Sequence, residues 1–158
     1  MKSFRQYLHQ TLNENDLPTT EGSSPKPTLF LIRGIPGSGK STLAKSLVQP
    51  DNHFETDQFW MTPDGKYNFD PARRSEAHAD TLARTSERLT NTKSDVAVSN
   101  TFTQVRELQP YLDLAKHHGW NTQIIRMTGN HGSIHDVPPD TIDQMKKRFE
   151  DIESERII

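Results

Sequence analysis

The segment that most restricts the fold of this chain is a glycine-rich run at residues 34–41, which reads GIPGSGKS. It matches the pattern G-x-x-x-x-G-K-[ST] in full. The preceding residues 28–32 are apolar and typical of a strand, and residues 42–48 have the character of a helix. A strand, a tight glycine turn and a helix N-terminus in this order form the frame of a phosphate-binding loop. The pattern therefore predicts a nucleoside triphosphate site.

Each residue type in this loop has a physical part in binding phosphate. Glycines let the backbone curl so that successive N–H groups point at phosphate oxygens. Lys40 is expected to reach the β- and γ-phosphates, and the Ser41 hydroxyl is expected to bind Mg²⁺. We therefore expect ATP and Mg²⁺ to bind here. The predicted nucleotide contacts in the loop are Gly34, Pro36, Gly37, Ser38, Gly39, Lys40, Ser41 and Thr42.

Strands and helices alternate along the rest of the chain. The predicted strands are 53–56, 96–99 and 123–127, and the predicted helices are 71–91, 104–118 (disturbed at Pro110) and 141–153. This alternation predicts an α/β fold, a doubly wound parallel sheet of about four to five strands with helices on both faces. Ligands bind such sheets at the carboxyl ends of the strands. Gly34, Asp57, Asn100 and the loop 128–137 are therefore expected around one site.

The chain of 158 residues divides into two unequal parts. Residues 1–27 carry apolar side chains at helical spacing, followed by a stretch rich in Pro, Ser, Thr and Gly; the apolar residues are Phe4, Tyr7, Leu8 and Leu12. They predict a short amphipathic helix and a flexible linker. That helix either packs on its own domain or tethers the chain to a protein partner. Residues 28–158 are predicted to form the P-loop domain.

Asp57 is the best candidate for a general base. It follows a short predicted strand, which places it at the carboxyl edge of the sheet, facing the γ-phosphate. Phosphoryl transfer needs a group that accepts the proton of the acceptor hydroxyl, and a carboxylate at this edge fits that need. Two other roles stay open for Asp57, as a ligand of Mg²⁺ and as a structural Asp that caps a helix or forms a turn.

The strand at 96–99 ends in Asn100 and Thr101, where many NTPases place an acidic residue. A polar end argues against a motor ATPase that activates water, and Asn100 is instead expected to contact the nucleotide. The segment 92–95 reads TKSD and imitates the base-reading motif of GTPases, but it precedes a strand, and no D-x-x-G follows the phosphate loop. These observations argue against a GTPase.

The segment from residue 131 onwards carries His131 and the basic run Lys146, Lys147 and Arg148. In a kinase, a segment in this place would be a lid that closes over the phosphates and excludes water. His131 is predicted to contact the nucleotide, and Arg148 is predicted to be catalytic. The alternative for the basic run is a solvated helix face.

The composition of the chain bears on its cellular compartment and on the partners that it can bind. It has no cysteine, a net charge of −2 and no apolar run long enough to cross a membrane. The absence of cysteine fits a reducing compartment, so we expect a cytoplasmic protein without membrane contact. The charge gives no sign of a long nucleic-acid groove, although a short contact with a strand end stays open. The spacing of the histidines matches no zinc signature.

Further motifs resemble the polynucleotide-kinase-like branch of P-loop kinases, which includes the 5′-hydroxyl kinase domain of T-even phages. The resemblance covers residues 28–150. Beyond the phosphate loop, it rests on Thr56-Asp57-Gln58-Phe59, Gly65-Lys66-Tyr67-Asn68-Phe69, Ala77-His78, Asn100-Thr101, Asn130-His131-Gly132, Val137-Pro138, Ile142, Met145, Arg148 and Glu150. It implies that Asp57 takes the proton of the acceptor hydroxyl and that residues 131–148 form the lid.

The chain departs from the phage kinases at two positions. They carry Arg three residues after the base, where this chain has Trp60, and a lid Arg where this chain has His131. The first change weakens the grip on a nucleic-acid phosphate, although Trp60 could stack on a base or sugar. The second leaves Lys147 or Arg148 as the lid cation.

Two functions follow as hypotheses. The first is an ATP- and Mg²⁺-dependent kinase that moves the γ-phosphoryl group to a hydroxyl acceptor, which could be a nucleic-acid 5′-hydroxyl end, a nucleoside or nucleotide, or another small molecule. The second is an ATP-binding module without phosphotransfer, docked to a larger assembly through its N-terminal helix.

Overall fold

A parallel sheet organises the computed structural model, which describes residues 25–132 and 136–158. The sheet has five strands in the order β2-β3-β1-β4-β5. The strands are β1 (Thr28–Arg33), β2 (His53–Phe54), β3 (Val96–Ser99), β4 (Asn121–Arg126) and β5 (Arg156–Ile157). Every paired neighbour is parallel. The predicted α/β class and strand number are confirmed. The predicted N-terminal helix falls within residues 1–24, outside the described residues.

The alternation of side chains along the strands builds a core on each face of the sheet. Phe30 and Ile32 of β1 pack with Leu43 and Leu47 on one face. Leu29 and Leu31, one position away, pack on the other face with residues of β3 and of the helices. Because successive side chains of a strand point to opposite faces, the uninterrupted apolar run of β1 is explained by burial on both sides.

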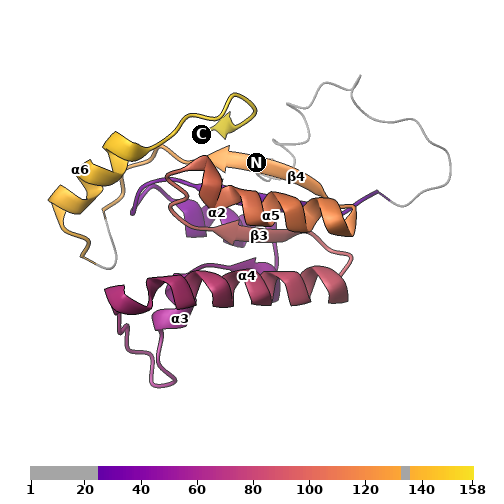
Figure 1. Cartoon of the computed structure of the whole chain (residues 1–158), viewed down its shortest axis with the longest axis horizontal. Coiled ribbons are helices and arrows are strands. Elements are labelled where there is room, and N and C mark those ends of the chain that lie inside the picture. Colours follow the sequence, from indigo (N-terminus) through magenta and orange to yellow (C-terminus); the bar gives the residue numbers. More distant parts are fainter. Residues whose placement is uncertain (1–24, 133–135) are drawn as a thin grey trace.

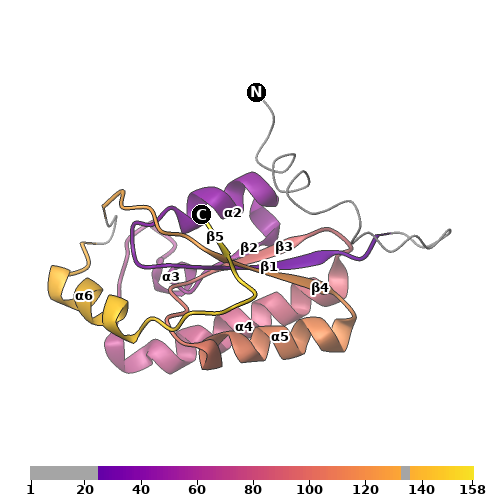
Figure 2. The same ribbon diagram turned by 90° about the horizontal axis from the view of Figure 1, so that it is seen from above.

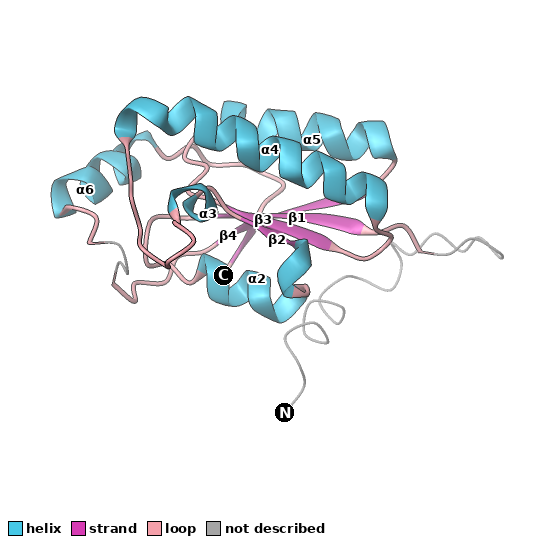
Figure 3. Ribbon diagram, turned by 90° about the horizontal axis from the view of Figure 1, so that it is seen from below, coloured by secondary structure: helices cyan, strands magenta, loops and turns pink. Residues whose placement is uncertain are grey.

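The helices cover both faces of the sheet, as predicted. Helix α2 (Lys40–Leu47) lies on one face, and α4 (Arg74–Asn91) and α5 (Val105–His118) lie side by side on the other (Figure 2). The same layers are seen from the opposite side in Figure 3. Helix α5 runs through Pro110 without a break, so the predicted disturbance is wrong. Its N-terminus carries a capping box between Gln104 and Glu107, and Gly119 ends it in a left-handed conformation.

Two short elements were absent from the sequence prediction. Asp57 does not close a strand. The strand β2 ends at Phe54, and Asp57 opens a one-turn helix, α3 (Asp57–Trp60). Near the end of the chain, β5 adds an edge strand beside β4, where Ile125 pairs with Arg156. Short 3-10 turns, Pro50–Asn52 and Pro71–Arg73, precede β2 and α4.

Helix α6 (Pro139–Arg148) lies beyond the carboxyl ends of the strands, apart from the layers of the sandwich (Figure 1). It ends earlier than the predicted residue 153, and the chain then returns to the sheet through residues 149–155. Among the described helices, none combines the length and apolar character that a membrane crossing requires. The placement of α6 brings the basic run of residues 146–148 to the same end of the molecule as the phosphate loop.

Candidate active site

The phosphate loop joins β1 to α2 at the carboxyl edge of the sheet. Gly37 and Gly39 take positive φ values of 80° and 96°, which side chains other than glycine rarely adopt. A Cβ atom on Gly37 would also lie 2.2 Å from the carbonyl oxygen of Gly132. The backbone of the 129–132 loop therefore lies directly against the phosphate loop, and the His131 amide donates to the Gly37 carbonyl oxygen at 2.8 Å.

Lys40 and Ser41 open helix α2, so both side chains lie where the helix N-terminus favours an anion. The Lys40 Nζ donates to the Ile35 carbonyl oxygen at 2.9 Å. Burial lowers the pKa of Lys40 to about 8, against the opposing effect of the Asp57 and Glu55 carboxylates. The Lys40 ammonium is thus a poorly hydrated cation. An anionic ligand beside it would stabilise its charge.

Asp57 faces the same cavity as Lys40. Its Oδ1 accepts a hydrogen bond from the Tyr67 hydroxyl at 3.0 Å. Burial and the neighbouring Asp57 carboxylate raise the pKa of Tyr67, which keeps the hydroxyl protonated as a donor. The turn before Asp57 is fixed by Thr56, whose amide donates to the Asn100 Oδ1 at 2.8 Å. The Asp57 carboxylate is therefore held at a defined position at the carboxyl ends of β2 and β3.

Asn100 lies at the end of β3 with one unused donor. Because its Oδ1 accepts from the Thr56 amide, its Nδ2 group is fixed on the other side. That Nδ2 is buried and has no hydrogen-bond partner among the described residues, although Asn100 lines the cavity. A buried donor left without a partner is costly, so this atom fits a ligand oxygen. The nucleotide contact of Asn100 stays a prediction.

Glu55 is a functional candidate that the sequence prediction missed. Its Oε2 accepts from the Ser41 hydroxyl at 2.7 Å and from the Ser99 hydroxyl at 3.1 Å. The signal was present in the sequence, since Glu55 is an acidic residue one position after the strand β2. It was read as part of the strand because it lies between His53-Phe54 and Thr56.

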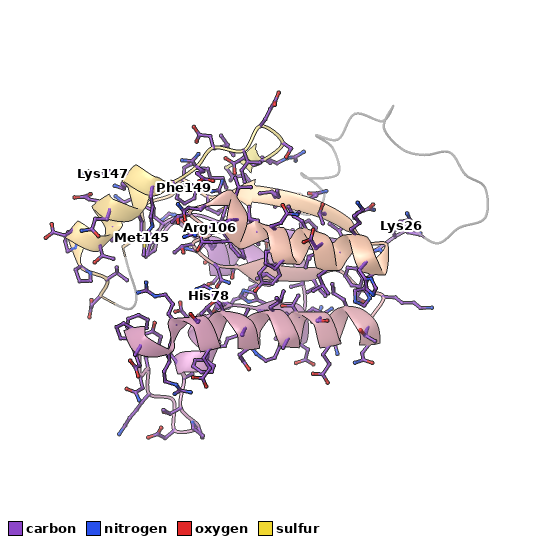
Figure 4. All side chains as sticks on the ribbon, in the orientation of Figure 1. Lys26, His78, Arg106, Met145, Lys147 and Phe149 are labelled. Atoms are coloured by element: carbon purple, nitrogen blue, oxygen red, sulfur yellow. The ribbon has the colours of Figure 1, made fainter. Side chains whose placement is uncertain are left out.

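The cations of the lid are placed differently from one another. Arg148 lines the cavity, and its Nε donates to the Thr103 hydroxyl at 3.3 Å. Lys146 and Lys147 are not among the described lining residues. Figure 4 shows Lys147 pointing away from α4, on a different side of α6 from Met145, a cavity-lining residue. Of the two lid cations proposed from the sequence, Arg148 is the one that reaches the site.

A cluster of aromatic and basic side chains forms the second half of the cavity. Trp60 is only 4% exposed, and its ring packs edge-on against Phe69 at a centroid distance of 5.1 Å. The stacking expected of Trp60 is thus limited by burial. Phe69 is 45% exposed, and the Arg74 guanidinium lies 5.9 Å from the centre of its ring. His78 of α4 faces the same space, and burial lowers its pKa.

These groups share one cavity of about 990 Å³, bounded by the phosphate loop, α3, the start of α4 and α6. Its lining brings together most of the predicted site residues, which are Pro36, Gly37, Gly39, Lys40, Ser41, Thr42, Asp57, Asn100, His131 and Arg148. Ser38 lines a smaller hollow beside it, together with Met127 and His131. Gly34 is buried below the loop and lines neither.

A family model described as an AAA domain matches residues 29–130, and the chain belongs to this P-loop family. Among curated proteins, human NEDD4-binding protein 2 is 38% identical over 94 residues. The match covers 57% of this chain and 5% of that protein, so the chain spans only a small part of this relative.

Solved structures share the fold at low sequence identity. A chain of the Pnkp1/Rnl/Hen1 complex superposes with a TM-score of 0.54 and 21% identity, over 79% of this chain and 40% of that chain. A gluconokinase from Sinorhizobium meliloti superposes with a TM-score of 0.53 and 17% identity, over 85% of this chain and 83% of that chain. The chain therefore has a kinase-like P-loop fold. The resemblance to polynucleotide-kinase-like proteins is confirmed at this level.

Proposed function

We propose that this chain is an ATP- and Mg²⁺-dependent kinase that transfers the γ-phosphoryl group to a hydroxyl acceptor. The observation that carries the proposal is that one cavity holds both a phosphate cradle and a carboxylate suited to act as a base. Lys40, Ser41 and Asp57 line it together. A cavity of about 990 Å³ exceeds the needs of a triphosphate alone, and its aromatic half is available to an acceptor.

In this proposal the Asp57 carboxylate accepts the proton of the acceptor hydroxyl as that oxygen attacks the γ-phosphorus and the bond to the β–γ bridging oxygen breaks. Lys40 and Arg148 lie on the lining to neutralise the phosphate oxygens. Ser41 and the carboxylates beside it offer oxygen atoms, the donor type that Mg²⁺ prefers, so the residues fit this ion. Bound Mg²⁺ would neutralise charge on the phosphates.

The acceptor class is left open among a nucleic-acid 5′-hydroxyl end, a nucleoside or nucleotide, and another small hydroxyl compound. The exposed Phe69 ring with Arg74 beside it suits an acceptor with a flat ring and a negative charge. The fold shared with a gluconokinase supports keeping small hydroxyl compounds among the acceptors to be tested.

The deciding experiment is incubation with γ-labelled ATP and a panel of 5′-hydroxyl RNA, 5′-hydroxyl DNA, nucleosides, nucleotides and sugars. Transfer of label to any one of them supports the kinase. Tight ATP binding without transfer to any panel member would support the binding module instead. Release of labelled phosphate alone, without a labelled acceptor, would indicate hydrolysis and would contradict both.

A further inference from the structure

The carboxylate of Glu55 lies closer to the phosphate loop than its position in the sequence suggests. It follows β2, whose neighbour in the sheet is β3. Its Oε2 lies 2.7 Å from the Ser41 Oγ and 3.1 Å from the Ser99 Oγ, and both hydroxyls donate to it. The side chain keeps 23% of its surface exposed and lines the cavity. The carboxylate is thus held by two donors yet still reaches the ligand space.

The strand next to β1 offers no negative charge of its own at this edge. β3 ends in Ser99, followed by Asn100 and Thr101, all of them neutral. Mg²⁺ at a triphosphate is usually bound by one or two carboxylates together with the phosphate oxygens. In this chain the nearest such group comes from the adjacent strand, because Ser99 and Ser41 together hold the Glu55 carboxylate.

Glu55 and Asp57, two of the carboxylates that line the cavity, have different hydrogen-bond partners. Glu55 accepts from Ser41, on the side of the phosphate loop. Asp57 accepts from Tyr67, on the side of the aromatic cluster. The Lys40 ammonium interacts with both, since both oppose the effect of burial on its pKa. This separation suits a division of labour between the metal side and the acceptor side of the cavity.

We propose that Glu55, with Ser41, forms the metal-binding side of this site and holds the divalent cation of Mg·ATP, which leaves Asp57 to the acceptor hydroxyl. The inference rests on the proposed function in so far as it takes Mg·ATP as the ligand. The competing explanation is structural. Glu55 also lies 3.7 Å from the His53 Nε2 and could serve only to fasten β2 to β3.

The test compares ATP binding with and without Mg²⁺ by calorimetry in the wild type and in Glu55→Gln. We expect the amide to reduce the gain in ATP affinity that Mg²⁺ provides by about tenfold or more. Affinity for ATP in the presence of EDTA should stay equal or rise, because a negative charge near the phosphates is removed. A merely structural role would weaken both affinities together and would overturn the inference.

Glu87→Gln is the matched control. Glu87 is an exposed carboxylate of α4 and is not among the residues that line the cavity. Its substitution therefore removes the same charge from the molecule without changing the site. In this variant, the gain in ATP affinity that Mg²⁺ provides should match that of the wild type. Glu55→Ser provides a second neutral variant with a small hydroxyl side chain, in case the amide prevents folding. It should lose the Mg²⁺ gain to the same extent.

The outcomes separate this inference from the kinase proposal. A Mg²⁺ gain within about twofold of wild type in a folded Glu55 variant overturns the metal role of Glu55, whatever the acceptor panel shows. A lost Mg²⁺ gain supports it even if no acceptor is ever labelled, because the measurement is an equilibrium of binding. Failure of the wild type to bind ATP at all would overturn both.

Discussion

Asp57 permits a sharp single-residue test, because Asn keeps the shape of its side chain and removes its charge. If Asp57 is the general base, Asp57→Asn should lower the rate of phosphoryl transfer by about 10²–10⁴-fold, the usual contribution of a positioned base. The affinity for Mg·ATP should stay nearly unchanged. Single-turnover transfer from γ-labelled ATP measures the first quantity, and calorimetry measures the second.

Asp64→Asn is the control for this change. Asp64 is an exposed carboxylate of the neighbouring loop that is not among the described lining residues. Its transfer rate should equal that of the wild type. A transfer rate of Asp57→Asn within about threefold of the wild type would remove Asp57 as the base. A parallel loss of Mg·ATP affinity would assign it to the metal.

Lys40 gives a prediction in pH, because burial lowers its pKa to about 8. Only the protonated ammonium attracts phosphate. Below pH 8 the free protein holds this proton, and above it the proton must be taken up when ATP binds. Affinity for Mg·ATP should therefore fall about tenfold between pH 7 and pH 9. Calorimetry at both pH values, in buffers of different ionisation enthalpy, should also detect proton uptake at pH 9.

The control for this titration is Lys40→Met, which keeps a long apolar stem and has no proton to lose. It should bind Mg·ATP weakly at both pH values, and its affinity should not change between pH 7 and pH 9. Equal affinity of the wild type at pH 7 and pH 9 would show that the ammonium does not titrate in this range, or that it does not contact the phosphates.

At the site, the sequence alone was informative where a motif has a fixed local geometry. The positions of Lys40 and Ser41 could be predicted because the strand, loop and helix are contiguous, and the position of Asp57 at the cavity could be predicted because it lies a few residues after β2. The place of Glu55 just after a strand was visible in the sequence, but its contacts with Ser41 and Ser99 were not, because both serines come from other segments. Glu55 meets Ser99 across 44 residues, and Phe69 meets Trp60 only through the folding of the 61–70 loop.

Among the elements, the segment after α6 is tied to the sheet by an unusual buried charge. Arg33, the last residue of β1, is 0% exposed, and its Nη1 donates to the Glu155 Oε2 at 2.7 Å. The same guanidinium donates to the Phe102 carbonyl oxygen and lies 4.3 Å from the centre of the Phe149 ring. Figure 4 shows Phe149 just beyond α6. The segment after α6 is thus anchored on the strand that leads into the phosphate loop.

Loss of the Glu155 charge should destabilise the protein strongly, because it leaves Arg33 buried without its anionic partner. We expect Glu155→Gln to lower the free energy of unfolding by about 3 kcal/mol, which corresponds to a fall in Tm of about 6–12 °C. Urea and thermal unfolding measure these quantities. The control is Glu153→Gln, an exposed residue of the same segment, which should stay within about 0.5 kcal/mol of wild type. A wild-type Tm in Glu155→Gln would mean that Arg33 is satisfied by its carbonyl partners alone.

The elements missed from the sequence are those that depend on tertiary contacts. A strand of two residues has no periodicity to detect, and β5 exists because Ile125 and Arg126 offer it an edge. The single turn of α3 depends on Gln58, which accepts from the Glu55 amide and donates to the His53 carbonyl oxygen. Helix α5 continues through Pro110 although this residue has no N–H to donate to the Arg106 carbonyl oxygen, and the helix is closed at its two ends by the capping box and by Gly119.

At the scale of the whole molecule, the described residues form an apolar core cluster on each face of the sheet. One face of the sheet is closed by α2, with Leu43, Ala44 and Leu47 against Phe30 and Ile32. The other is closed by α4 and α5, through Leu89, Leu108 and Tyr111. The described residues from Pro25 onwards therefore bury apolar side chains on both faces of the sheet.

Removal of residues 1–24 is accordingly expected to leave the fold and the nucleotide site intact. The Tm should change by less than about 3 °C, and the affinity for Mg·ATP should stay within about twofold. A double substitution in the full chain, Phe4→Ser with Leu8→Ser, is the matched control, because it removes apolar surface without removing chain. If both variants aggregate or lose about 6 °C or more, the segment completes the core, and its tether role is wrong. If both keep the wild-type Tm, the apolar residues Phe4, Tyr7, Leu8 and Leu12 serve no purpose in stability, and a protein partner is the remaining explanation for them.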